Sequence, residues 1–152
     1  IKYIPMWLNE LQRDIKFNAD FYLLDKAVGL ELDNVQSRYK KLPENWITFT
    51  RHQLSLDSIS NIIKSYDLLP NESDVGFVFI VEALDKVQEA AIINCVFFNI
   101  KSRAILWNAK AYGWAKSGNM NNHWARAINR AISGYFKYYS KQYKLYKKRI
   151  KL

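Results

Sequence analysis

Three side chains of the types found in hydrolase triads lie close together in the sequence, at His52, Ser55 and Asp57. In such a triad a serine attacks the substrate and a histidine takes its proton. Here the three positions fall within six residues, and the sequence around them has none of the glycine pattern that exposes a nucleophilic serine on a sharp turn. We therefore interpret Ser55 as the N-cap of a helix and expect no catalytic site here.

Glu82, Asp85 and Glu89 surround a predicted hairpin connection. Two carboxylates can act together as general acid and general base, but carboxylates at hairpin ends are usually just hydrated, and this is our interpretation. The only histidines, His52 and His123, are too few for a metal site without further ligands. The sequence thus predicts neither an enzyme nor a metal-binding protein.

Cys95 is the single cysteine and lies in an apolar stretch. It excludes an internal disulfide and any site built from several cysteines, and we interpret it as a small buried hydrophobic side chain. The five glycines are too scattered to form a loop that cradles a phosphate or a dinucleotide. We therefore expect no cofactor.

Positive charge is the strongest chemical signal, and it lies in the last 32 residues. Residues 121–152 contain no Asp or Glu, and their nine Lys and Arg account for the whole formal net charge of +9. On a helix, the apolar and aromatic residues from Trp124 to Tyr146 form one stripe. The opposite side carries six cations, which we call the basic face and treat as a candidate surface for an anionic partner: Arg126, Arg130, Lys137, Lys141, Lys144 and Lys148.

A basic amphipathic helix has three interpretations. The simplest is a helix that packs on the core and whose outer lysines are only hydrated. The second is docking on an anionic membrane or partner surface, with interleaved tyrosines at headgroup level. The third is nucleic-acid binding, in which lysines contact phosphates and tyrosines stack on bases. The sequence leaves all three open.

Two predicted helices have to position these groups. Residues 56–66 place apolar side chains at helical spacing, Ser55 can cap their start, and Pro70 follows their end. The second helix is the long amphipathic one, from about residue 121 to residue 148. The stretch 117–122, rich in Gly and Asn, is predicted to form the turn and cap before it.

From residue 75 the hydrophobic period changes to two. Residues 75–84, 90–100 and 104–116 are predicted strands, and their short connections require an antiparallel meander. The first is almost continuously apolar, which is typical of a central strand. One face of the third strand is rich in small side chains: Ile105, Trp107, Ala109, Ala111, Gly113 and Ala115. We expect Trp124 and Ile128 of the last helix to be buried on that face.

A chain of 152 residues with 49% hydrophobic residues has the size and composition of one packed domain. We predict an α+β fold in which residues 55–140 form the core and residues 141–152 form a basic helical tail. Residues 1–50 give weaker patterns, namely a short helix within 1–17 and short strands at 20–24 and 46–49, of which we expect at most one to join a sheet. The longest apolar run, residues 77–81, is too short to cross a membrane.

The meander and the start of the last helix carry a recognisable pattern. Two strands and a turn at residues 99–103 are followed by Ile105, Leu106 and Trp107, then by a strand end that contains glycine, and then by Trp124 in the last helix. This pattern resembles bacterial cell-envelope lipoproteins of the curli-secretion and penicillin-binding-protein-activator type, and uncharacterised secreted α+β domains of Gram-negative gut bacteria. It covers residues 75–140. The chain departs from the lipoproteins because no lipidation cysteine stands at its start and Cys95 lies within a strand.

The resemblance implies a non-enzymatic domain in the periplasm or at the outer membrane, and it transfers no catalytic residue. We therefore predict a cell-envelope or secreted domain that binds a protein, glycan or membrane-surface partner. The alternative is a small nucleic-acid-binding protein that uses the basic face. A signal peptide or lipobox encoded upstream of Ile1 would favour the first prediction, and a start codon directly before Ile1 would favour the second.

Overall fold

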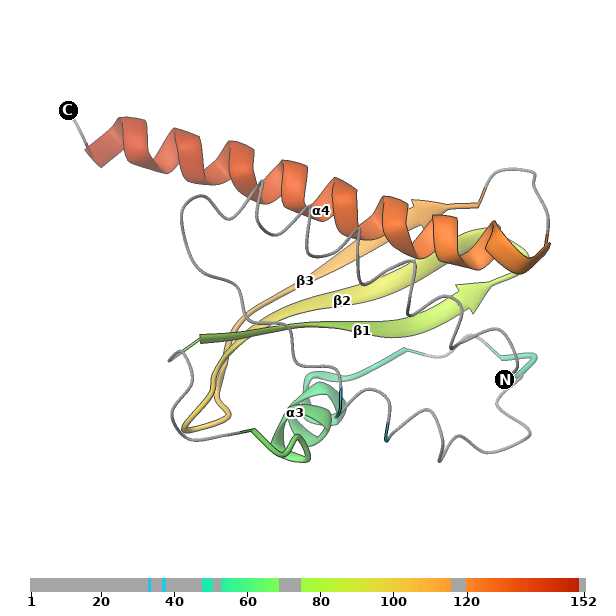
Figure 1. The fold of residues 1–152 in the computed structure, drawn as a ribbon, viewed down its shortest axis with the longest axis horizontal. Helices are drawn as coiled ribbons and strands as arrows, with labels where there is room; N and C mark the ends of the chain where they lie inside the picture. The colour runs from blue at the N-terminus through green and yellow to red at the C-terminus, as the bar shows by residue number, and fades with distance from the viewer. Residues whose placement is uncertain are drawn as a thin grey trace.

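The computed structural model describes residues 48–50, 53–68, 75–115 and 120–150, together with the helical positions Asp33 and Ser37. Their fold is α+β, as predicted. The elements, labelled as in Figure 1, are α3 (Leu56–Lys64), β1 (Val75–Asp85), β2 (Ala90–Asn99), β3 (Ile105–Trp114) and α4 (Met120–Ile150). The elements predicted within residues 1–45, and the loop predicted at residues 69–74, lie outside the described residues.

Helix α3 begins at the predicted cap. The Ser55 hydroxyl accepts a hydrogen bond from the Ser58 amide at 3.1 Å, which satisfies one of the free donors of the first turn. The helix ends at Lys64, two residues before the predicted end, where the Ser65 amide bonds to the carbonyls of the last turn. The strand predicted at residues 46–49 is wrong for the two positions that are described, because Thr48 and Phe49 are exposed and not in a strand.

The three strands form an antiparallel meander in the order β1-β2-β3, and their bounds lie within two residues of the predicted ones. In the described sheet β2 is central, so the central position predicted for the first strand is wrong. The apolar run of β1 has another cause, since both of its faces are covered. Phe77 and Phe79 pack toward α4, whereas Val78 and Ile80 pack toward α3.

The two connections of the meander are tight turns closed by side chains. Asp85 accepts hydrogen bonds from the amides of Val87 and Gln88, both at 2.9 Å. The second turn uses Asn99 in the same way, with the Ser102 amide at 2.7 Å. These local bonds stabilise the turns, because a short polar side chain replaces a missing main-chain partner.

The sheet lies between two apolar clusters, with α4 across one face and α3 beside the other (Figure 1). Alternate residues of β2 serve the two sides, because successive side chains of a strand point to opposite faces. Ile93 and Cys95 are fully buried under α4, and Val96 and Phe98 are buried toward α3. Buried residues of α4 complete the first cluster: Ala127, Ile128, Ala131, Ile132, Tyr135 and Phe136.

Helix α4 approaches the sheet very closely at Gly113 of β3. A Cβ atom added there would lie 1.8 Å from the carbonyl oxygen of Ala127 and 2.5 Å from the amide nitrogen of Ala131. Only a glycine leaves room for the helix backbone at this distance. The prediction that α4 packs on the small-residue face is therefore confirmed. The contact with that face is made by the helix backbone and alanines rather than by aromatic side chains.

The aromatic part of α4 lies further along the sheet. Phe136 is fully buried, and its ring contacts those of Phe77 and Phe79 edge to face, with centroids 5.7 and 5.6 Å apart. Of the two residues expected on the third strand, Ile128 is buried and Trp124 only half-buried. That part of the prediction is thus only partly right, because the backbone contact at Gly113 already fills the space that a bulky side chain would occupy.

One member of the predicted small-residue face, Ile105, lies on the other side of the sheet. The register shifts between Phe97 and Phe98, opposite Trp107 and Ile105. Because an extra residue in one strand reverses which face the following side chains meet, Ile105 packs in the cluster on the α3 side. Trp107 stays on the α4 side, opposite Phe97, but is 56% exposed.

Candidate functional site

Helix α4 presents its basic face to solvent because its other side is fixed on the sheet. At 100° per residue, all six positions of the basic face fall within a stripe about 60° wide along the helix. The structure exposes the side chains of Arg126, Arg130, Lys137, Lys141 and Lys144. Lys148 lies within α4, but its side chain is outside the described part of the structure. Nearly the whole predicted surface is thus brought together on one helix.

Arg130 shows which way this stripe faces. Its Nη1 donates a hydrogen bond of 2.7 Å to the main-chain carbonyl oxygen of Trp114, at the end of β3. Arg126 lies one helical turn earlier on the same side. The N-terminal half of the basic face therefore runs beside β3, and its C-terminal half continues along the same line.

The C-terminal turns of α4 extend past the end of the sheet (Figure 1). Phe136 and Tyr139 still pack on the core cluster, whereas the described side chains after Ser140 are all exposed. Two large apolar side chains are exposed beside the lysines, with Tyr138 at 58% and Leu145 at 47%. They are two turns apart on the helix and border the basic stripe directly. This end of α4 is therefore amphipathic on its outer side.

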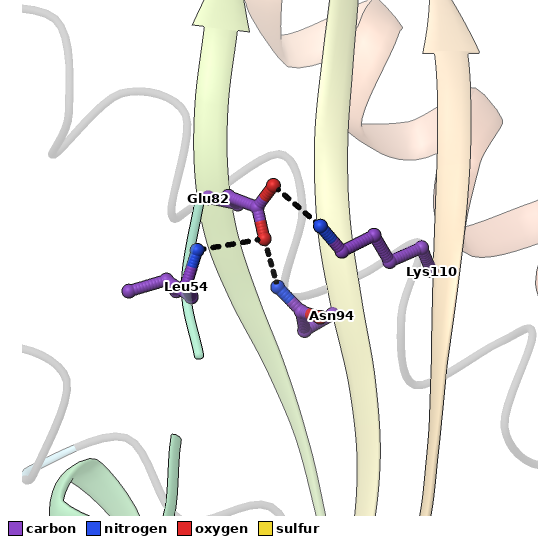
Figure 2. Close-up of polar contacts among 4 residues, drawn as sticks. All are labelled: Leu54, Glu82, Asn94 and Lys110. Carbon is purple, nitrogen blue, oxygen red and sulfur yellow. Dashed lines mark hydrogen bonds and ion pairs between the residues drawn. The ribbon is translucent and has the colours of Figure 1, made fainter. Parts of the chain in front are cut away.

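A polar cluster that was not predicted from the sequence lies on the face of the sheet opposite α4. It takes one residue from each strand, Glu82 of β1, Asn94 of β2 and Lys110 of β3 (Figure 2). The Glu82 carboxylate accepts hydrogen bonds from Lys110 Nζ at 2.8 Å, from Asn94 Nδ2 at 2.9 Å and from the Leu54 amide at 3.3 Å. We call Glu82, Asn94 and Lys110 the cross-sheet cluster.

This cluster stabilises a buried charge. Only 2% of the Glu82 side chain is exposed, against 35% for Lys110. Burial raises the pKa of Glu82, but hydrogen bonds from Lys110, Asn94 and the Leu54 amide, together with the charge of Lys110, outweigh burial and hold the pKa below its usual 4.5. A carboxylate with a lowered pKa is a poor proton donor or acceptor near neutral pH, so this arrangement favours a structural role.

The three hairpin carboxylates are therefore not alike. Glu89 is exposed, as expected of a hydrated group, and adopts a positive φ of 50°. Asp85 departs from that expectation, because it is half-buried and accepts hydrogen bonds from the amides of the turn. Glu82 departs from it further, because it is buried and paired with Lys110. The three carboxylates therefore have three different surroundings.

The other residues considered for catalysis or metal binding include a serine, a histidine and the single cysteine. Ser55 caps α3, and His52 lies outside the described residues. Burial raises the pKa of the Cys95 thiol to about 12, so this residue is a buried hydrophobic side chain, as predicted. In the described parts of the chain, no three or more His, Cys, Asp or Glu side chains are grouped so as to hold a metal ion.

Three comparisons with known proteins found no relative of this chain. The profiles of protein families, the curated proteins and the solved structures each gave no match. Among the helices of residues 48–50, 53–68, 75–115 and 120–150, none combines the length and apolar character needed to cross a membrane. Function must therefore be argued from the surfaces of the chain itself.

Proposed function

We propose that this chain is a non-enzymatic cell-envelope or secreted domain that docks on an anionic membrane surface through the basic face of α4. The pattern in the meander supports a place in the periplasm or at the outer membrane. The observation that carries the proposal is the exposed end of α4, where Lys137, Lys141 and Lys144 stand beside the exposed Tyr138 and Leu145.

That combination suits a lipid headgroup layer better than a solvated surface. Lysines on the polar side of an interfacial helix attract anionic lipids, while aromatic and aliphatic side chains beside them enter the headgroup boundary. Lys137 and Lys144 are seven residues apart, or about 10 Å along the helix, so the three lysines can reach headgroups at once. Each lysine near such a surface contributes about 1 kcal/mol, or about 3 kcal/mol together.

The described positive charges of the basic face all lie on the solvent side of α4. Residues 121–152 contain no acidic side chain that could neutralise the stripe. The sheet holds α4 by its opposite side, so docking would require no rearrangement of the core. Since Arg130 is partly engaged with Trp114, the lysines beyond the sheet are the freest part of the basic face.

Vesicle co-sedimentation tests the proposal. We expect binding to vesicles with about 30% phosphatidylglycerol, no binding to pure phosphatidylcholine, and steep weakening with salt because surface charges are screened over about 10 Å at 0.1 M. Changing Lys137, Lys141 and Lys144 together to Gln should weaken binding by about a hundredfold. The matched control changes three exposed lysines elsewhere, Lys64, Lys86 and Lys101, and has the same net charge.

Three results would overturn the proposal. If both triple variants bind equally, net charge alone acts and the face has no role. If a DNA or RNA duplex binds at 150 mM salt more tightly than the anionic vesicles do, the nucleic-acid alternative takes its place. Absence of binding to either at low salt would leave the lysines as a hydrated surface.

A further inference from the structure

The outer edge of β3 has main-chain groups that face away from the sheet. In an antiparallel ladder, alternate residues direct both their N–H and C=O groups toward the neighbouring strand. The Ala115 amide bonds to the Glu89 carbonyl at 2.6 Å, which sets this alternation for β3. The residues that direct their main chain outward are therefore Asn108, Lys110, Tyr112 and Trp114.

One of these outward groups is already occupied. The Trp114 carbonyl accepts the hydrogen bond from Arg130, which closes that end of the edge. Within the described structure, the outward amides and carbonyls of Asn108, Lys110 and Tyr112 have no such partner. Three consecutive outward positions are enough to pair with a segment of five or six residues.

The side chains along this edge are unusually apolar for an exposed strand. Exposed edge strands are usually short or carry charged residues that prevent pairing. Here the strand has ten residues and only one charged side chain, Lys110, which is held by Glu82. The large apolar side chains that β3 exposes are 49 to 59% accessible: Leu106, Trp107, Tyr112 and Trp114.

The charges around the edge indicate what covers it. Arg126 and Arg130 border one end from α4, and Lys101 precedes the other end in the turn before β3. Glu82 is neutralised by Lys110, and Glu89 is an exposed acid at the Trp114 end. The surroundings are therefore positive on balance. A second copy of the chain would bring a second positive edge against the first, whereas an acidic segment would complement it.

We propose that the edge of β3 binds an extended acidic segment of a partner protein, which adds to the sheet as a further strand. Main-chain hydrogen bonds to Asn108, Lys110 and Tyr112 supply the attachment, as in other cases of strand addition. Successive side chains of the bound segment would point to the two faces of the sheet in turn, so each face determines the type of every second residue. Tyr112 and Trp114 lie on the face away from α4, whereas Arg126 and Arg130 come from the α4 side. The segment therefore alternates apolar and acidic residues.

The probe is a synthetic ten-residue peptide of alternating Val and Glu, with a peptide of the same composition but clustered glutamates as control. Amide hydrogen exchange by NMR reads the contact directly. We expect the amides of Asn108, Lys110 and Tyr112 to exchange fast in the free protein and at least tenfold slower with the alternating peptide. The inward amides of Ala109 and Ala111 should already be protected without it.

Substitutions at Tyr112 separate main-chain pairing from side-chain contact. Tyr112→Pro removes an outward amide and no bond to β2, so peptide affinity should fall at least tenfold. Tyr112→Val keeps the amide and should bind within about threefold of the unchanged protein. If the proline variant does not fold, N-methylation of alternate peptide residues removes the same hydrogen bonds from the other side and should abolish protection.

Several results would overturn this inference. These are equal binding of the clustered peptide, peptide binding without protection of the outward amides, and protection in the free protein that disappears on dilution, which would identify a second copy as the occupant. The outcome is separable from membrane docking, because the variant with Gln at Lys137, Lys141 and Lys144 should still bind the peptide. Loss of peptide binding in that variant would place the peptide on the end of α4 and refute strand addition.

Discussion

The Glu82 carboxylate of β1 and the Lys110 ammonium of β3 lie 2.8 Å apart, although their strands are separated by β2. Asn94 lies between them and donates to the same carboxylate. The cross-sheet cluster thus links the two outer strands directly, in addition to the main-chain ladders. Because the Glu82 carboxylate is buried, removing any one of its partners would leave a buried charge less well compensated and would destabilise the fold.

Replacing Lys110 by Met should destabilise the fold, because a buried carboxylate would lose its countercharge. We expect a loss of about 1 to 3 kcal/mol, below the 3 to 5 kcal/mol typical of fully buried pairs, because Lys110 is one-third exposed. Urea unfolding followed by tryptophan fluorescence measures it. Lys86→Met, at an exposed turn position, is the control and should change stability by less than about 0.5 kcal/mol. Equal effects of the two changes would show that the ion pair contributes nothing.

The cross-sheet cluster also predicts how stability depends on pH. The pKa of Glu82 is lowered in the folded state, so its contribution is fully present above the unfolded-state value of 4.5 and is lost as the pH falls through the lower folded-state value. We expect the unfolding free energy to decrease below pH 4.5, and to decrease less steeply in Glu82→Gln. Denaturant titrations between pH 6 and pH 3 measure both slopes. Parallel curves for the two proteins would contradict this prediction.

Gly113 and Gly134 offer a matched pair of substitutions. Gly113→Ala would force its new methyl group against the backbone of α4 and should cost about 1 to 3 kcal/mol or more. Gly134→Ala meets nothing within 4 Å on the exposed side of the same helix, so it should stabilise the protein by about 0.5 to 1 kcal/mol. Thermal melts should therefore shift in opposite directions. A shift of the same sign would show that α4 does not seat on Gly113.

Phe136 and Trp124 test where the aromatic core lies. Phe136→Ala should cost about 3 to 5 kcal/mol, because the ring is fully buried between β1 and α4. Trp124→Ala should cost clearly less, since Trp124 is only half-buried. Unfolding curves of the two variants give the ranking. A larger loss for Trp124 would restore the sequence-based expectation that this residue anchors the helix.

The elements were predictable because their periods are unambiguous. The switch from a helical period to alternation and back located α3, the three strands and α4 to within about two residues. The cap at Ser55 and the seat for α4 on small residues such as Ala111 and Gly113 followed from side-chain type alone. The basic face also followed, since charge segregation on a helix needs only the 100° rotation per residue.

The cross-sheet cluster was not predicted because it depends on register. Glu82 and Asn94 are polar residues inside otherwise apolar runs and Lys110 is the one charged residue of its strand, and these features were the available signal. Asn94 lies directly opposite Lys110 in the ladder, but Glu82 stands at an irregularity between Val81 and Ala83 that the sequence does not reveal. The position of β1 was missed for a related reason, because an apolar run reports covered faces and not the number of neighbouring strands.

Strand β2 contributes side chains to both apolar clusters, so unfolding on one side of the sheet is coupled to unfolding on the other. Ile93 contributes to the cluster under α4, and Val96 contributes to the cluster beside α3. Neither helix can keep its packing if β2 leaves the sheet, so the two sides should unfold in a single transition. A ligand that stabilises α4 would therefore also lower the equilibrium population in which α3 is open, although the two helices lie on opposite sides of the sheet.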